Sequence, residues 1–265
     1  MATLAGIHIY PLKSGAPLQR DEALVEPRGL VHDRRWMVVD EQGSFLTARK
    51  HPRLTLIRAQ PDGDWLTLDA PAMPRLQLKP APDDRRDDVV VWDSTVRAAW
   101  ADATAQAWIS EFLCAPARFV FMDSGCARAI DPTYSTPGDE VSFADGYPLL
   151  LISQAALDHL NAKLIEPIPM LRFRPNLVVA DTRAHAEDDW KRIRVGGIEF
   201  EIVKPCMRCT IPTIDIETGE FDPHGEPLRT LKTYRRAAKG VSFGQNLIPR
   251  GAGTLRLGDR VEVLG

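Results

Sequence analysis

Long apolar runs are missing from the 265-residue sequence, which has no stretch of about 18 or more apolar residues that a membrane-spanning helix requires. The first residues, MATLAGIHIYPLKSG, also lack the basic segment followed by an apolar segment that is typical of a secretion signal. We therefore expect a protein of the cytoplasm with no membrane partner.

Neither sign of charge is in large excess, because 36 acidic and 33 basic residues give a formal net charge of −3. No block rich in lysine and arginine stands out, and the sequence has no internal repeat or low-complexity tract. Proteins that bind nucleic acid usually carry a basic patch or stripe. We therefore expect no nucleic-acid partner.

Cysteine is scarce, and four residues in the chain are too few for a disulfide scaffold. Two of them, Cys206 and Cys209, lie three positions apart in KPCMRCTIPTIDIETG. A structural zinc site would need a second pair of ligands, which Cys114, Cys126 and the scattered histidines do not offer. A thioredoxin-like pair would begin a helix, but the proline and β-branched residues after Cys209 disfavour one.

Two interpretations of this pair remain open on the residues alone. Free cysteine often packs as a small, inert hydrophobic residue, and this reading suits Cys206 best. Cys209 has Arg208 and Lys204 nearby, and cations of this kind favour the thiolate. Because a thiolate is a nucleophile and a soft metal ligand, Cys209 could bind a soft metal centre.

The first hundred residues alternate short apolar runs with turn residues about every ten positions, a pattern typical of antiparallel β structure. Two hairpins are predicted, with turns at residues 40–43 and 61–64. A further strand pair should turn near Asp93 and Ser94. The segment 73–88 is rich in proline and charge, which predicts a solvated loop.

Helices are predicted after Asp102 and after Ser153, two residues suited to capping a helix N-terminus. The apolar residues repeat with helical spacing at Ala105, Trp108, Ile109, Phe112 and Leu113 in the first, and at Leu157, Leu160 and Leu164 in the second. Strand-like runs surround the second helix, and a long irregular connection precedes it. We expect a mainly β protein with covering helices, of the α+β class.

Two further clusters offer groups that bind anions. In YPLKSG, Lys13, Ser14 and Gly15 provide a positive charge, a hydroxyl and a close backbone approach that suit a phosphate. Turns of this composition are often merely solvated. In HDRRW, Arg34 or Arg35 could clamp an anion with two hydrogen bonds if it faced a barrel mouth, the alternative being an ordinary surface arginine.

Taken in order, seven motifs of the chain resemble the MOSC superfamily with its β-barrel N-terminal companion domain. These motifs are YPLKSG, GLVHDRRWMVVD, FLTARKHPRL, LLISQAALDHLN, RFRPNLVV, KPCMRCTIPTIDIETG and SFGQNL. The chain is similar to mitochondrial amidoxime-reducing components and to bacterial reductases of N-hydroxylated bases. The resemblance implies a MOSC N-terminal β-barrel domain at 1–120 and a MOSC β-barrel domain at 121–265, which share one cofactor cleft.

The resemblance also implies a molybdenum cofactor, whose metal is held by the dithiolene sulfurs of a pterin and by one protein cysteine. Motif matching assigns that cysteine to Cys209 and places Asp145 near the metal, where both would be catalytic. Lys13, Ser14 and Arg34 would hold the pterin phosphate. The other cofactor-binding residues implied in this way are Arg174, Asn176 and Arg208.

These assignments are chemically reasonable. A pterin phosphate carries about two negative charges, which cationic side chains offset in a buried site. The carboxyl of Asp145 could position a water or relay protons if its surroundings moved its pKa toward neutrality. The alternative is a turn aspartate before Gly146.

The activity implied by the resemblance is reduction of N-hydroxylated compounds to amines. No flavin, haem or iron–sulfur motif is present in the sequence, so the electrons would come from a separate electron-transfer protein. The alternative is a carrier or delivery protein that uses Cys209 to pass on sulfur or the molybdenum cofactor without redox turnover.

Overall fold

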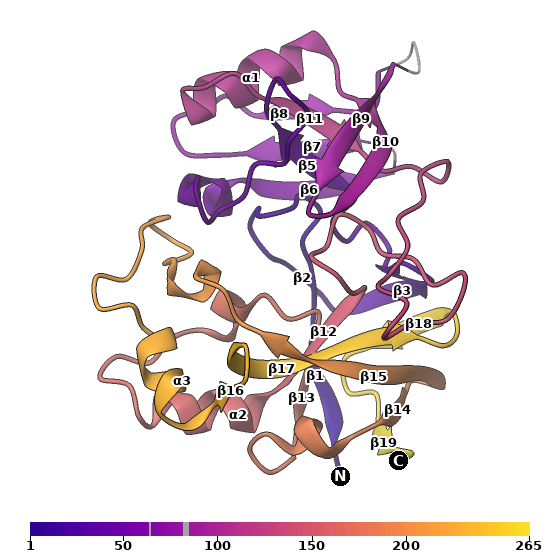
Figure 1. Cartoon of the computed structure of the whole chain (residues 1–265), viewed down its shortest axis with the longest axis vertical. Helices are drawn as coiled ribbons and strands as arrows, with labels where there is room; N and C mark the ends of the chain where they lie inside the picture. The colour runs from indigo at the N-terminus through magenta and orange to yellow at the C-terminus, as the bar shows by residue number, and fades with distance from the viewer. Residues whose placement is uncertain (64, 82–84) are drawn as a thin grey trace.

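Strands dominate the computed structural model, which describes residues 1–63, 65–81 and 85–265 (Figure 1). These residues form nineteen β-strands and three α-helices. The prediction of a mainly β fold of the α+β class is therefore confirmed.

The upper half in Figure 1 is built from antiparallel sheets and the helix α1. Its elements are β5 (Trp36–Val39), β6 (Arg58–Asp62), β7 (Trp65–Asp69), β8 (Leu76–Leu78), β9 (Arg86–Val91), β10 (Ser94–Trp100), β11 (Arg118–Phe121) and α1 (Ala103–Leu113). The antiparallel orders are β5-β11-β10-β9 and β6-β7-β8. Trp108 and Phe112 of α1 belong to the apolar core here, and Trp108 packs near Phe119 of β11.

The local predictions for this half hold in all but one segment. The side chain of Asp102 accepts a hydrogen bond from Ala105 N at 2.8 Å, so the predicted cap of α1 is confirmed. The β6–β7 hairpin forms, although position 64 of its predicted turn lies outside the described residues. The turn at 40–43 also forms, with Val39 bridging Phe45.

The prediction of a solvated loop at 73–88 is wrong. This segment contains β8 and the start of β9, while residues 82–84 lie outside the described part of the chain. Leu76 and Leu78 are buried and Gln77 between them is exposed, which is the alternation of a strand with one face on a core. Burial of these two leucines outweighs the proline and charge around them.

The lower half is built on a nine-stranded sheet. Its strands are β1 (Thr3–Ile9), β2 (Leu18–Arg20), β12 (Leu149–Ser153), β13 (Leu177–Ala180), β14 (Arg192–Val195), β15 (Ile198–Met207), β16 (Arg236–Ala237), β17 (Gly240–Pro249) and β19 (Val261–Val263). The order is β19-β14-β15-β17-β12-β13-β1-β2, and β16 pairs with β17. A smaller sheet contains β18 (Gly253–Arg256), β3 (Glu22–Glu26) and β4 (Gly29–Leu30).

The first strand lies among strands from the second half of the sequence. β1 pairs antiparallel with β13, so the N-terminal residues lie in a sheet formed mainly by the second half of the sequence. The chain then rises into the upper half, where Lys13 N donates a hydrogen bond to Trp36 O at 2.7 Å. Lys13 and Ser14 therefore lie where the halves meet, and the division into 1–120 and 121–265 stays a prediction.

Helices α2 (Gln154–Asn161) and α3 (Leu228–Tyr234) lie on one side of the lower half (Figure 1). The hydroxyl of Ser153 accepts a hydrogen bond from Ala156 N, which confirms the predicted cap of α2. Leu157 and Leu160 are buried in the core beneath α2. Leu164 lies beyond the end of the helix but packs against the same core.

Glu187 is completely buried behind the start of α2. Its Oε1 accepts a hydrogen bond from Ser153 N at 3.1 Å, and its Oε2 has no partner within the part of the chain that the structure describes. Burial raises the pKa of Glu187 above the usual 4.5, despite its bonds to Ser153. Ionisation of Glu187 therefore opposes folding.

Glu187→Gln is expected to stabilise the protein in a pH-dependent way. Because the raised pKa belongs to the folded state, the wild type loses stability as pH rises through the interval between the unfolded and folded pKa values. The variant keeps the acceptor for Ser153 N and does not ionise. The difference in free energy of unfolding between the variant and the wild type should therefore grow by up to about 1.4 kcal/mol per pH unit within that interval. Urea unfolding at several pH values measures this, and a difference that is independent of pH would contradict it.

Candidate functional site

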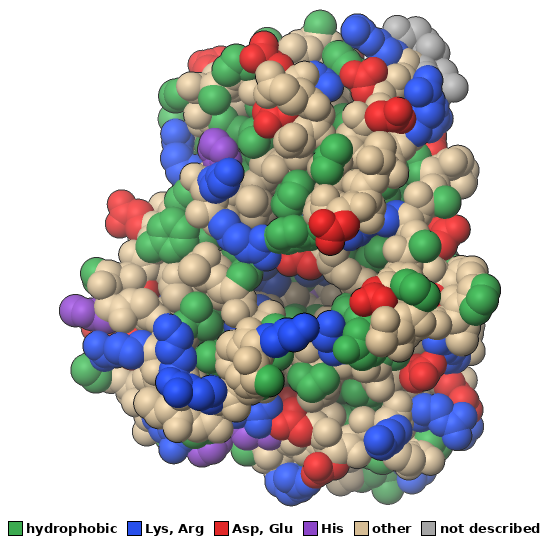
Figure 2. Space-filling model, viewed as in Figure 1, with side chains coloured by type: hydrophobic (Ala, Val, Ile, Leu, Met, Phe, Trp, Pro, Cys, Tyr) green, Lys and Arg blue, Asp and Glu red, His purple; other side chains and the backbone are tan. Residues whose placement is uncertain are grey.

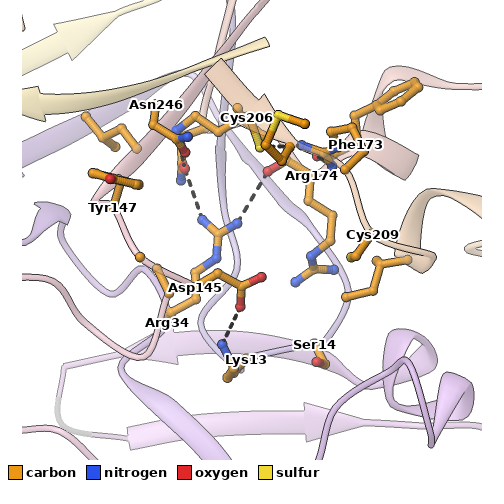
Figure 3. A pocket seen from close by; sticks show the side chains of 18 of the residues that line it. Lys13, Ser14, Arg34, Asp145, Tyr147, Phe173, Arg174, Cys206, Cys209 and Asn246 are labelled. Carbon is orange, nitrogen blue, oxygen red and sulfur yellow. Dashed lines mark hydrogen bonds and ion pairs between the residues drawn. The ribbon is translucent and has the colours of Figure 1, made fainter. Parts of the chain in front are cut away.

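A pocket opens between the two halves of the molecule and contains all eight residues predicted for the site (Figures 2 and 3). They are Lys13, Ser14, Arg34, Asp145, Arg174, Asn176, Arg208 and Cys209. Both halves contribute, and residues nearly two hundred positions apart in the sequence, such as Lys13 and Cys209, line the same pocket. The structure brings the predicted residues together, while the role of each stays a prediction.

Three of these residues have unusual backbones. Ser14, Arg34 and Arg174 have φ values of 67°, 49° and 58°, in the left-handed region that residues with side chains rarely adopt. Such conformations cost on the order of 1–3 kcal/mol and cluster at ligand-binding sites. Ser14 and Arg34 lie in turns, and Arg174 follows a short 3₁₀ helix (Met170–Phe173); all three line the pocket (Figure 3).

Lys13 and Asp145 form an ion pair in the pocket. Lys13 is 5% exposed, and its Nζ donates to Asp145 Oδ1 and to Phe143 O, both at 2.7 Å. Arg49 Nη2 lies 3.3 Å from Asp145 Oδ2. The side chain of Asp145 is 60% exposed; its partial desolvation would raise its pKa, but Lys13 and Arg49 outweigh this and hold the pKa below its usual value. The carboxyl is therefore ionised near neutral pH, and its pKa does not move toward neutrality.

Arg34 and Arg174 both stack on the buried ring of Tyr10. Their guanidinium carbons lie 4.1 and 4.2 Å from the ring centroid, a cation–π distance. Arg34 pairs with Asp33 at 2.6 Å, and Arg174 Nη1 donates to Gly15 O at 2.6 Å. Burial, followed by repulsion from Arg34, lowers the pKa of Arg174 to about 10, so it remains charged near neutrality.

Asn176 holds Arg34 in place. Its Oδ1 accepts hydrogen bonds from Arg34 Nη1 and from Leu150 N, both at 3.1 Å, and its Nδ2 donates to His8 O at 3.1 Å. The side chain is 1% exposed. Since both ends of the amide have protein partners, the geometry supports a positioning role more than direct contact with a ligand.

Cys206 and Cys209 have different surroundings. Arg208 Nη1 donates to Cys206 Sγ at 2.9 Å and its Nη2 donates to Phe173 O at 2.7 Å. Burial raises the pKa of the Cys206 thiol, and Arg208 only partly offsets this. Cys209 follows the end of β15 and lies away from Cys206 in Figure 3. The two cations expected near Cys209 make other contacts. Arg208 donates to Cys206 and Phe173, and Lys204 Nζ lies 4.4 Å from the centroid of the Tyr134 ring.

Positive charge is in excess in this pocket. Its described lining contains Lys13, Arg34, Arg49, Arg174 and Arg208, against the carboxylate of Asp145. The Nε atoms of Arg49 and Arg208 are buried and lack hydrogen-bond partners among the described residues. A bound anion would satisfy such donors and offset the repulsion between the cations.

Sequence reasoning did not identify Arg49, Asp33 and Tyr10 as part of the site. Arg49 lies in the motif FLTARKHPRL and Tyr10 in YPLKSG, so the motifs contained a signal for both. Asp33 has no exposed surface and shows its role only through its bonds to Arg34 and Tyr10 N. Within the described ranges, no group of three or more His, Cys, Asp and Glu side chains could hold a metal ion, so the structural zinc reading gains no support.

Two known domains match the chain. Residues 1–116 match the MOSC N-terminal beta barrel domain, and residues 138–262 match the MOSC domain. The fold and the shared pocket thus define a protein with both MOSC domains, as the motifs predict.

Curated relatives narrow this class. Mitochondrial amidoxime-reducing component 1 of Mus musculus is 34% identical over 284 residues, which cover 100% of this chain and 83% of the relative. The same protein of Homo sapiens is also 34% identical, with 100% and 84% covered. Mitochondrial amidoxime reducing component 2 of Rattus norvegicus is 33% identical, with 98% and 83% covered. The chain belongs to the family of amidoxime-reducing components with MOSC domains.

The expected cytoplasmic location is contradicted by these relatives, whose names place them in mitochondria. The absence of a recognisable secretion signal was a poor guide, since it says nothing about other destinations in the cell. Across the residues that the structure describes, none of the helices has the length and apolar character needed to cross a membrane.

Proposed function

We propose that this protein is a molybdenum cofactor-dependent oxidoreductase that reduces N-hydroxylated compounds to amines, with electrons from a separate donor protein. The observation that carries the proposal is the pocket, which combines the half-buried thiol of Cys209 with an excess of cations. The names of the relatives support the substrate class, because an amidoxime is an N-hydroxylated amidine.

The chemistry of the pocket fits the proposed cofactor. Lys13, Arg34 and Ser14 would hold the pterin phosphate, since they offer two positive charges and a hydroxyl beside one another. Arg174 and Arg208 would add charge, and the unpartnered Nε of Arg208 is a donor without an acceptor. Cys209 would hold the metal through a soft thiolate sulfur.

The overall reaction consumes two electrons and two protons, because the N–OH group becomes N–H and the oxygen leaves as water. The molybdenum cofactor, when bound, supplies a two-electron redox centre. The ionised carboxylate of Asp145 accepts a hydrogen bond from a substrate N–H or a water and thereby orients it. Lys13 Nζ uses two of its three donors on Asp145 and Phe143 O, which leaves one for a ligand.

The test is to produce the protein in a host that makes the cofactor, and to measure its molybdenum and pterin content and its turnover of a small aromatic amidoxime with reduced methyl viologen. Near-stoichiometric molybdenum and pterin with repeated turnover are expected. A loaded protein without turnover would instead favour the carrier function. Protein without either component would overturn the proposal.

A further inference from the structure

A basic surface lies beside the pocket, on α3 and on the β16–β17 hairpin. Residues 227–240 contain five basic residues and no acidic one, although the whole chain has a net charge of −3. Arg229 pairs with Glu226 and Arg235 with Asp188. Lys232, Arg236 and Lys239 are exposed and have no hydrogen-bond or ion-pair partner among the described residues. We call these three residues and Arg229 the α3–β16 surface.

The backbone connects this surface directly to the pocket. β16 pairs with the start of β17, with Arg236 opposite Val241. On the other side of β17, Arg208 N donates to Val241 O at 2.8 Å. Arg236 is therefore two strand spacings, or about 10 Å, from the backbone next to Cys209. Figure 2 shows blue side chains gathered over α3 and β16, below and to the left of the hollow between the halves.

We propose that the α3–β16 surface docks the acidic face of the electron-donor protein, an inference that rests on the proposed function. Each turnover would oxidise the donor by two electrons, which reach the pocket and, with two protons from solvent, reduce N–OH to N–H and water. Lys232, Arg236 and Lys239, which are exposed and have no acidic partner among the described residues, would attract and orient an acidic protein, which raises the association rate more than the final affinity. Their position two strands away from the end of β15, which leads to Cys209, brings the donor to the pocket.

A membrane fits this surface less well. Membrane-surface helices combine basic residues with an exposed apolar face that enters the lipid. Residues 227–240 are all described and include no large exposed hydrophobic side chain, and Leu231 of α3 is buried in the core. The experiment must therefore distinguish binding to an anionic membrane from docking of an acidic donor protein.

The experiment compares two triple variants of the cofactor-loaded protein with equal charge changes. One is Lys232→Glu/Arg236→Glu/Lys239→Glu, and the control replaces the exposed residues Arg20, Arg58 and Lys191 by glutamate. The probe donor is an acidic plant-type ferredoxin with its reductase and NADPH, and reduced methyl viologen serves as a donor that needs no docking. The kcat/KM for ferredoxin should fall roughly 10- to 100-fold in the first variant at low ionic strength, and little in the control.

Added salt should reduce the difference in kcat/KM for ferredoxin between the two triple variants, because screening weakens interactions between exposed charges. Rates with methyl viologen should stay equal in the three proteins. Equal losses in both variants, or a wild type that neither binds nor accepts electrons from ferredoxin, would overturn the inference. The inference would also be overturned if the first variant lost binding to phosphatidylserine vesicles while its kcat/KM for ferredoxin stayed unchanged, because the surface would then bind a membrane. Failure of the wild type with methyl viologen would refute the proposed function, while ferredoxin binding by the variants would still test the surface.

Discussion

Cys209→Ser is expected to lower turnover of an amidoxime by at least roughly 10³-fold, because loss of even an outer partner of a metal ligand costs 10- to 100-fold. A serine hydroxyl is a harder donor than a thiolate and ionises far less readily, so it would hold a soft metal centre poorly. The molybdenum content of the purified variant should fall with the activity. Elemental analysis and X-ray absorption, which counts sulfur ligands, provide readouts that do not depend on turnover.

Cys206→Ser is the matched control for this prediction. The serine oxygen can still accept the hydrogen bond that Arg208 Nη1 donates to Cys206 Sγ at 2.9 Å, so the position of Arg208 should be kept. Molybdenum content and turnover should change by less than about tenfold, the lower end of outer-partner effects. Equal losses of molybdenum and turnover in the two variants would contradict a single cysteine ligand. Retention of molybdenum in Cys209→Ser would show that Cys209 is not the metal ligand.

Local features of the fold could be predicted from the sequence, whereas strand order could not. The caps at Asp102 and Ser153 depend on residues within one helical turn, and both form as expected. The pairing of β1 with β13 joins Thr3 to Ala180, and no local pattern contains that information. At 73–88, composition predicted a loop because the two buried leucines of β8 are a short signal among many polar residues.

The same distinction applies to the site. The motifs identified eight residues that share one pocket, but they did not show which of them hold others in place. The lowered pKa of Asp145 arises from Lys13 and Arg49, which come from distant parts of the chain. The α3–β16 surface could not be predicted from the sequence. Its basic residues are spaced three or four positions apart and form no continuous run, and only the helix and hairpin bring them together.

Asn176→Ala is expected to destabilise the protein by about 3 kcal/mol, since each buried polar group left without a partner costs about 1–3 kcal/mol. The substitution would leave Leu150 N and His8 O unsatisfied and would release one bond to Arg34. A loss of this size lowers the melting temperature by roughly 6–12 °C in a protein of this size. Since Arg34 would also lose its support, cofactor content should fall even at temperatures where the variant is folded.

Asn246→Ala is the control for this effect. Asn246 also lines the pocket, but among the described residues its side chain makes one hydrogen bond, from Nδ2 to Lys204 O at 3.2 Å. Loss of one such bond is expected to cost about 1 kcal/mol. Thermal unfolding of the two apo variants separates stability from cofactor binding, and pterin analysis of the loaded proteins then measures retention. Equal melting temperatures would show that the network around Arg34 does not depend on Asn176, and that Asp33 and the ring of Tyr10 suffice to hold this arginine.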